Sequence, residues 1–223
     1  MKREKTTLII IQLKLMSRAA GIAVLVALLG LLSALLAVFL QRFGIDWNLP
    51  LVTMVLNLFV CGVLFSENVY SSKSERRRYR TMYPDWKMLV SIKNTAVTIL
   101  LIIVPLPVLI AELSLFDATM EQISEGFLYL ASALPTFLFI GNAVHWLTVD
   151  RPGFVETLLI TGLQPGSVFI SSVPYLTITS LFDSRVALIS VSAALLICCR
   201  FLLPQFGARL IMHHFNNVVP AYE

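Results

Sequence analysis

The chain has 223 residues, of which 57% are hydrophobic and 13% are charged, and its mean hydropathy is +0.83. Soluble domains carry about 45–50% apolar and about 25% charged residues. The composition excludes an ordinary soluble domain and predicts an all-α, polytopic membrane protein. The net charge of +4 does not indicate a nucleic-acid partner, because basic loops on the inner side of a membrane explain it.

The first eighteen residues combine basic side chains with an apolar stripe. Lys2, Arg3, Lys5, Lys14 and Arg18 flank a run rich in Leu and Ile. This pattern predicts an amphipathic helix over residues 1–18 that lies on the cytoplasmic surface of the membrane. A signal peptide is the alternative, but the next apolar run, residues 19–40, is longer than the roughly 7–15 residues of a signal peptide's apolar region.

Six apolar runs are predicted to cross the membrane, at residues 19–40, 51–65, 95–111, 127–148, 167–182 and 186–203. The second span is expected to extend by a turn at either end. Pro105 and Pro107 should kink the third span, and Pro174 should break the fifth. The fifth span has two open starting points, residue 167 and a point near Phe154.

The polar segments between these spans fix the orientation. Internal segments are predicted at residues 66–94, 149–166 and 204–223, and an acidic external segment at residues 112–126. Fifteen of the seventeen Lys and Arg residues then lie inside, and Arg42 and Arg185 lie outside. Because cytoplasmic loops carry an excess of Lys and Arg, six spans with both termini in the cytoplasm are the preferred topology.

The chain lacks the sequence motifs of common enzymes. It contains no GxxxxGK(S/T) phosphate loop, no GxSxG, no HExxH and no glycine-rich dinucleotide turn. His213 and His214 are adjacent and would point in different directions on a helix, and the three cysteines have no zinc-like spacing. We therefore expect no catalytic residue, no metal and no cofactor in this chain. An intramembrane enzyme is a poor alternative, because no Asp, Glu or His residues cluster at one depth.

Three polar residues inside or at the end of predicted spans are candidates for a substrate path. These are Asn57, Asn142 and His145. The simpler interpretation of the two asparagines is hydrogen bonding between helices, worth about 0.6 kcal/mol and up to about 2 kcal/mol. For His145, a hydrogen bond at the end of the fourth span is the simpler interpretation.

The two internal loops share a pattern of charge, a short helix-like piece and a proline before the next span. The first loop has a charged cluster of Glu75, Arg76, Arg77 and Arg78, followed by Tyr83 and Pro84. The second loop has the pair Asp150 and Arg151, Gly153, the run ETLL at residues 156–159, and Gln164 before Pro165.

This pattern resembles the permease family of the second ABC exporter type, whose members carry an acidic-basic pair, a Leu-Leu run and a proline after the second span. The resemblance implies a coupling helix seated on a separate ATPase. If the helix is located by its place after the second span, it is residues 79–87. If it is located by the match to the family's residue pattern, it is residues 154–165. The residues that would contact the ATPase are Glu75, Arg76, Arg77, Arg78, Tyr79, Tyr83, Pro84, Trp86, Phe154, Glu156 and Leu159.

The resemblance also implies the partners and the location. The chain would pair with an identical or a sister permease subunit over two ABC ATPase chains, with ATP and Mg²⁺ bound only by the ATPases. It would lie among the lipids of a bacterial inner membrane and export an amphipathic or apolar substrate. Two alternatives remain open: a membrane scaffold or assembly factor that binds a soluble partner through its basic loop, and a loop that merely touches anionic lipid.

Overall fold

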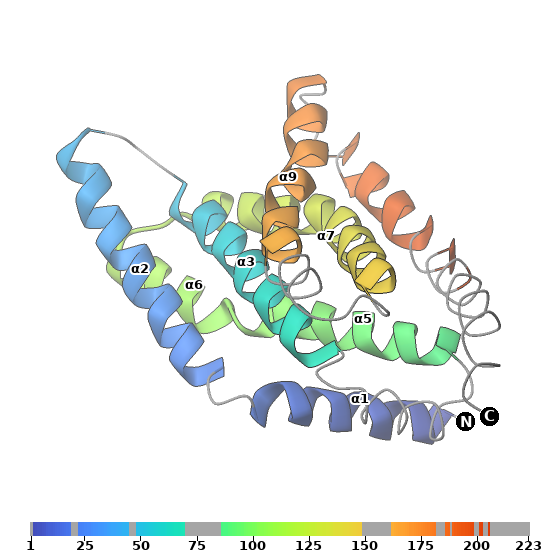
Figure 1. The fold of residues 1–223 in the computed structure, drawn as a ribbon. Helices are drawn as coiled ribbons and strands as arrows, with labels where there is room; N and C mark the ends of the chain where they lie inside the picture. Colours follow the sequence, from blue (N-terminus) through green and yellow to red (C-terminus); the bar gives the residue numbers. More distant parts are fainter. Residues whose placement is uncertain are drawn as a thin grey trace, which may run out of the picture.

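The computed structural model describes residues 2–18, 22–44, 48–69, 86–148, 162–181, 186–187, 189–198, 201–202 and 205. This part of the chain is helical and contains no β-strand, so the all-α prediction is confirmed. The bounded helices, shown in Figure 1, are α1 (Lys2–Arg18), α2 (Ile22–Arg42), α3 (Leu49–Val69), α5 (Trp86–Ile103), α6 (Leu106–Leu115), α7 (Met120–Thr148) and α9 (Gln164–Leu181).

Local caps set several helix ends. Gly44 follows α2 with a left-handed φ of 64°, a conformation that costs glycine little. The Asn48 side chain accepts a hydrogen bond from the Leu51 amide at 3.2 Å and caps α3. Thr119 and Gln122 form a reciprocal capping box at the start of α7, with distances of 2.8 Å and 3.2 Å. The turns before α3 and α7 are therefore encoded locally.

Helix α3 occupies the centre of the described structure. It packs against α7 and α9 and also contacts α1, α2, α5 and α6 (Figure 1). Its buried face includes Met54, Leu58 and Cys61, which recur at spacings of four and three and so share one side of the helix. Phe137 of α7 is also fully buried in this core.

A glycine allows α3 and α7 to approach closely. A methyl group added to Gly126 of α7 would lie 2.9 Å from the carbonyl oxygen of Pro50 and 3.3 Å from the side chain of Met54. Small residues commonly occupy such crossing points between membrane helices because they let two backbones come together.

Helix α1 lies across one end of the molecule, at the foot of Figure 1, and packs against α5 and α3. Gln12 is buried against the rest of the molecule, whereas Lys5, Lys14 and Ile10 are exposed. The sequence predicted a helix here, and α1 has both a covered face and a free face that mixes basic and apolar side chains.

Prolines interrupt the chain between α5 and α6, whereas α7 continues through Pro135 and α9 through Pro174. The predicted kink near Pro105 and Pro107 is found, because α5 ends at Ile103 and α6 begins at Leu106. The predicted break at Pro174 is wrong, because α9 continues through it. Buried residues on both sides of Pro174, Val168 and Tyr175 among them, hold α9 in the core and compensate for the lost backbone hydrogen bond.

Helices α3 and α5 both extend into the segment predicted as the first internal loop. Residues 66–94 were predicted to lie outside the spans, but α3 continues to Val69 and α5 begins at Trp86. Lys93, expected in the loop, lies within α5 and is only 4% exposed. The reason is that α1 covers this part of α5, where Val90 and Ile92 are buried as well.

Most of the segment at residues 112–126, which the sequence predicts to be external, is helical. Its first four residues belong to α6 and its last seven to α7, and only residues 116–119 lie between the two helices. Glu112 is consequently buried between helices, with 1% of its surface exposed. The cause is that α6 continues past the apolar run and packs against α2 and α3.

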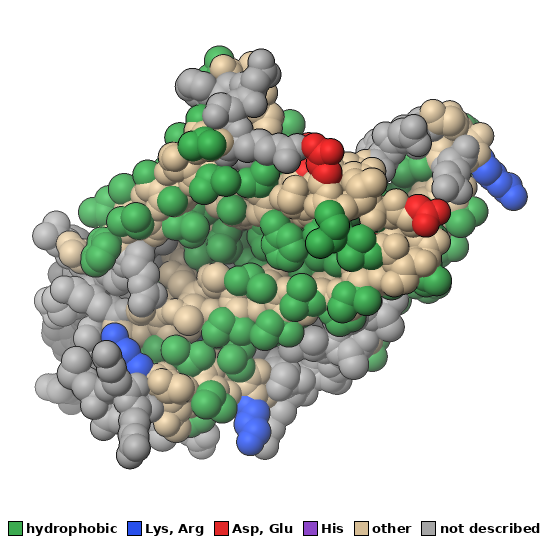
Figure 2. Space-filling model, turned by 180° about the vertical axis from the view of Figure 1, so that it is seen from behind, with side chains coloured by type: hydrophobic (Ala, Val, Ile, Leu, Met, Phe, Trp, Pro, Cys, Tyr) green, Lys and Arg blue, Asp and Glu red, His purple; other side chains and the backbone are tan. Residues whose placement is uncertain are grey.

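Two described helical stretches, Val90–Leu115 and Met120–Ala143, are long and apolar enough to cross a membrane, judged by length and composition. Shorter apolar helical stretches lie at Leu28–Leu40, Leu49–Val63, Gly166–Leu181 and Ile189–Cys198, within or overlapping the other four predicted spans. Figure 2 shows many hydrophobic side chains across the described part of one face, with basic side chains near its lower edge and both acidic and basic side chains near its upper edge.

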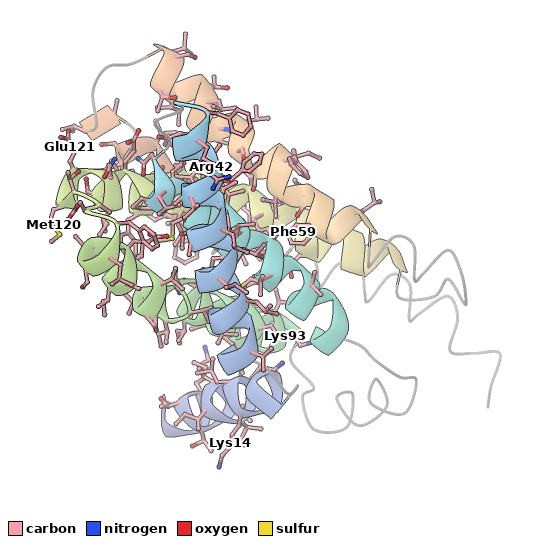
Figure 3. All side chains as sticks on the ribbon, turned by 90° about the vertical axis from the view of Figure 1, so that its left-hand side faces the viewer. Lys14, Arg42, Phe59, Lys93, Met120 and Glu121 are labelled. Carbon is pink, nitrogen blue, oxygen red and sulfur yellow. The ribbon has the colours of Figure 1, made fainter. Side chains whose placement is uncertain are left out.

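Figure 3 locates several labelled residues, among them the buried Lys93, relative to the helices. Lys14 and Lys93 lie toward one end of the molecule, and Arg42, Met120 and Glu121 lie toward the other. The end with Lys14 is the end that α1 crosses (Figure 1).

Candidate functional site: buried polar contacts between helices

A chain of hydrogen bonds joins three helices around a buried carboxyl group. The Thr53 hydroxyl of α3 donates to Oε1 of Glu112 on α6. The Ser33 hydroxyl of α2 lies 3.1 Å from the Thr53 hydroxyl. Because Thr53 has one hydrogen and gives it to Glu112, Ser33 is the donor in that second contact. All three side chains are buried.

The second oxygen of the Glu112 carboxyl group takes no part in this chain of hydrogen bonds. Oε2 of Glu112 is buried and has no hydrogen-bond partner among the described residues. An ionised carboxylate without a partner is very costly to bury in apolar surroundings. Ionisable groups inside a membrane protein are rare for this reason and usually mark a functional site. Glu112 is therefore the leading candidate for a functional group among the described residues.

The end of α6 fixes the position of Glu112. Its backbone carbonyl accepts hydrogen bonds from the amides of Phe116 at 3.1 Å and Ala118 at 3.3 Å. Between them, Asp117 adopts a left-handed φ of 54°, which Asp tolerates better than most residues. The carboxyl group thus projects from a well-defined helix end towards α3.

Asn57, a predicted substrate-path residue, has a structural partner. Its side-chain amide donates to the backbone carbonyl of Leu101 at 2.8 Å. In a regular helix that carbonyl would accept the amide hydrogen of residue 105, but Pro105 has none. Asn57 replaces the missing donor and so ties α3 to the end of α5. Its own side-chain oxygen is buried and has no hydrogen-bond partner among the described residues.

Asn142 joins α7 to α5. Its side-chain amide lies 3.0 Å from the side-chain oxygen of Asn94 and 2.6 Å from the backbone carbonyl of Leu138. The simpler interpretation of both asparagines, hydrogen bonding between helices, agrees with these contacts. His145 lies within α7, but its side chain is outside the described part of the structure.

A second group of polar side chains joins α3, α7 and α9 near the end that carries Glu121. The carboxyl group of Glu125 accepts hydrogen bonds from Asn48 at 2.6 Å and from Tyr175 at 3.1 Å. The ring of Tyr175 packs edge-on against Tyr129 at a centroid distance of 5.2 Å. Tyr129 in turn hydrogen-bonds to Ser172 at 2.8 Å. These polar groups all have partners, so they read as structural contacts.

Most of the predicted ATPase-contact residues lie outside the described residues. This holds for Glu75, Arg76, Arg77, Arg78, Tyr79, Tyr83, Pro84, Phe154, Glu156 and Leu159. Trp86 is placed as the first residue of α5, although its side chain is not described. The described part of the chain contains no group of three or more His, Cys, Asp or Glu residues that could hold a metal ion.

The contact between Ser33, Thr53 and Glu112 was not predicted from the sequence. Glu112 was counted with the acidic residues that follow it, yet it stands directly after an apolar run, in LIAELSL, with two leucines after it. That surrounding sequence was the signal for a residue inside a helix. Ser33 and Thr53 could not be singled out, because isolated hydroxyl residues are common in apolar helices.

No protein-family model, no curated protein and no solved structure matches the chain. Its function is therefore inferred from its own residues and their arrangement.

Proposed function

We propose that the chain is the membrane-embedded subunit of an ATP-driven exporter, with six membrane-crossing segments and a separate ATPase as its partner. The observation that carries the membrane part of this proposal is the layered distribution of charge. Exposed apolar side chains on α2 lie between an end that carries Lys14 and an end that carries Arg42 and Glu121 (Figure 3). A large apolar surface of this kind is typical of a lipid-facing protein.

The N-terminal helix supports the proposed orientation. The exposed part of α1 combines Lys5 and Lys14 with Ile10 and Ile11, a mixture that favours the interface of an anionic membrane. Helix α1 packs against α5, whose first residue follows the basic loop. Both basic segments are then on the cytoplasmic side, as positive charge on loops predicts.

The transport part of the proposal rests on the loop pattern. In this mechanism the ATPases close on ATP and push on a short helix in a cytoplasmic loop, at residues 79–87 or residues 154–165. The spans then change between inward-open and outward-open states. The substrate would be amphipathic or apolar, and the ATP and Mg²⁺ would be bound by the partner chains. A second permease subunit, identical or related, would complete the pore.

A double substitution in the first loop tests the coupling role. Tyr83→Ala with Trp86→Ala should abolish transport and leave membrane insertion intact, because buried aromatic anchors typically contribute about 2 kcal/mol or more to an interface. Export of a fluorescent amphipathic dye from cells, together with co-purification of an ATPase from native membranes, is the measurement. Normal export by the double variant would transfer the coupling role to Phe154, Glu156 and Leu159.

Neutralising the arginines provides the matched comparison. Arg76→Gln, Arg77→Gln and Arg78→Gln together should weaken ATPase association in a salt-dependent way, as charges at the rim of an interface do. If no ATPase co-purifies with the wild-type chain and a different soluble protein does, the exporter proposal fails and the scaffold alternative replaces it.

Site-directed labelling tests the orientation independently of transport. Cysteine at position 14, in place of Lys14, should react with a membrane-impermeant maleimide only from the cytoplasmic side. Cysteine at position 119, in place of Thr119, should react only from outside. Labelling of position 119 from the cytoplasm would contradict the six-span topology.

A further inference from the structure

Among the described side chains of the helices that pack against α6, none is a charged partner of the buried Glu112 carboxyl group. On α2 the ionisable side chain is Arg42, which is exposed near the end of that helix. On α3 the described one is Cys61, about two helical turns beyond Thr53. Neither side chain forms an ion pair or a hydrogen bond with Glu112 among the described residues, and α6 has no other ionisable group.

The hydrogen bonds around Glu112 limit the ligand that could occupy it. Thr53 donates to Oε1, and Ser33 donates to Thr53, so the hydrogens of both hydroxyl groups are already used. The remaining free position is on Oε2. Metal ions such as Ca²⁺ require about six or more oxygen ligands. A single free oxygen atom is too few for such an ion, but it is sufficient for a proton.

We propose that Glu112 is a proton-binding site, in which Oε2 carries the proton and Oε1 is the carbonyl oxygen that accepts the hydrogen bond of Thr53. The protonated group is neutral, so its burial among Val108, Leu109 and the face of α3 leaves no uncompensated charge. The proposal concerns this site alone and does not depend on the exporter function.

The position of α6 gives the site a means of exchanging its proton. Helix α6 is separated from α5 by the turn at Val104 and Pro105, and from α7 by residues 116–119. Loss of the proton would leave a carboxylate whose Oε2 has no hydrogen-bond partner among the described residues, so it would need water or a counter-ion. Release of the proton is therefore coupled to separation of α6 from α2 and α3, and binding of the proton to their contact.

Infrared spectroscopy of the purified full-length chain in lipid nanodiscs tests the site directly. At neutral pH the wild type should show the carbonyl stretch of a protonated carboxyl group, which shifts in D₂O. Glu112→Gln should lose this band. The matched control is Glu121→Gln, which removes an exposed carboxyl group at the start of α7 and should leave the band unchanged.

A second variant keeps the test valid if Glu112→Gln does not fold. Thr53→Val removes the hydrogen bond to the carbonyl oxygen, so the band should move to higher frequency. Ser33→Ala acts one step further away and should cause a smaller shift in the same direction. A band that is unchanged in Thr53→Val, or still present in folded Glu112→Gln, would overturn the proposal.

A salt comparison separates the proton from a metal cation. Replacing NaCl by choline chloride at constant concentration should leave the unfolding temperature of the wild type unchanged. If sodium raises that temperature in the wild type and not in Glu112→Gln, a bound metal cation replaces the proton as the ligand and the proposal fails.

Discussion

Individual polar residues among the apolar helices of this protein form specific hydrogen bonds that hold neighbouring helices together. The side-chain amide of Asn57 donates to the carbonyl of Leu101, the acceptor that Pro105 leaves without its usual backbone donor. The sequence predicted a hydrogen bond for Asn57 and a kink at Pro105, but not that the two belong together. Their connection depends on how α3 packs on α5, which no local pattern encodes.

A double-mutant cycle tests this connection. The backbone at Pro105 is helical, with φ −77° and ψ −15°, so Pro105→Ala should place an amide hydrogen on the Leu101 carbonyl. Asn57→Leu should therefore destabilise the wild type, and its cost should be smaller in the Pro105→Ala background. The expected coupling energy is about 0.6–1.7 kcal/mol, the range of hydrogen bonds between membrane helices. Reversible unfolding in mixed micelles is the measurement.

Pro107→Ala is the matched control for that cycle. Pro107 lies in the same turn region, but its missing amide hydrogen does not face the Leu101 carbonyl. The cost of Asn57→Leu should be the same with and without Pro107→Ala. Equal coupling for both prolines would mean that Asn57 responds to the kink in general rather than to one unpaired carbonyl.

At the scale of helices, apolar runs located the elements well and their ends poorly. The third span was expected to start at Thr95, after Lys93, yet α5 begins at Trp86 and packs against α1. Likewise, the acidic run from Glu112 suggested an external segment, although Glu112 belongs to α6. In both cases a charged residue was assigned to water, whereas a neighbouring helix covers it.

The starts of α3 and α7 carry clearer local signals in the sequence than the start of α5 does. Asn48 before a helix with Pro50 in its first turn, and Thr119 three residues before Gln122, are recognisable start signals in the sequence. Helix breaks were predicted near Pro105 and at Pro174, and the structure has the first but not the second. A proline therefore marks a position where a helix can break, and the packing on either side decides whether it does.

The crossing of α3 and α7 offers a test at this scale. Gly126→Ala would place a methyl group 2.9 Å from the Pro50 carbonyl, so the two helices must move apart. Overpacking of this kind typically costs about 1–3 kcal/mol. The unfolding temperature of the purified variant in detergent should fall accordingly.

Gly30→Ala on α2 is the control for that variant. No atom lies within 4 Å of the added methyl group, so alanine should be neutral or slightly stabilising because of its higher helix propensity. If both variants lower the unfolding temperature equally, the close approach at Gly126 is not what makes its substitution costly.

At the scale of the whole molecule, the surface is dominated by side chains that avoid water. On helix α2 alone, between 47% and 59% of the surface of each of five side chains is exposed: Leu28, Leu31, Leu32, Leu35 and Phe39. The all-α class and the apolar character followed from composition. Which charges are exposed at the two ends could be seen only in the structure, because Glu112 and Lys93 are buried and do not add to the surface charge.

This surface predicts the solution behaviour of the protein. The purified chain should be monodisperse in detergent or nanodiscs and should aggregate when detergent is removed, because contiguous exposed apolar patches associate in water. Size-exclusion chromatography with light scattering is the measurement. A monodisperse species in plain buffer would show that a second chain or a different arrangement covers α2, and would argue against a lipid-facing surface.

The turn at Val104 and Pro105 has a consequence for the evolution of this chain. A proline at position 105 leaves the Leu101 carbonyl without its usual helical donor, and Asn57 supplies a hydrogen to that carbonyl. In descendants of a common ancestor, a change of Pro105 to another residue removes the demand for asparagine at position 57. Once homologous sequences are aligned, the two positions should vary together, and asparagine at 57 should be rare wherever 105 is not proline.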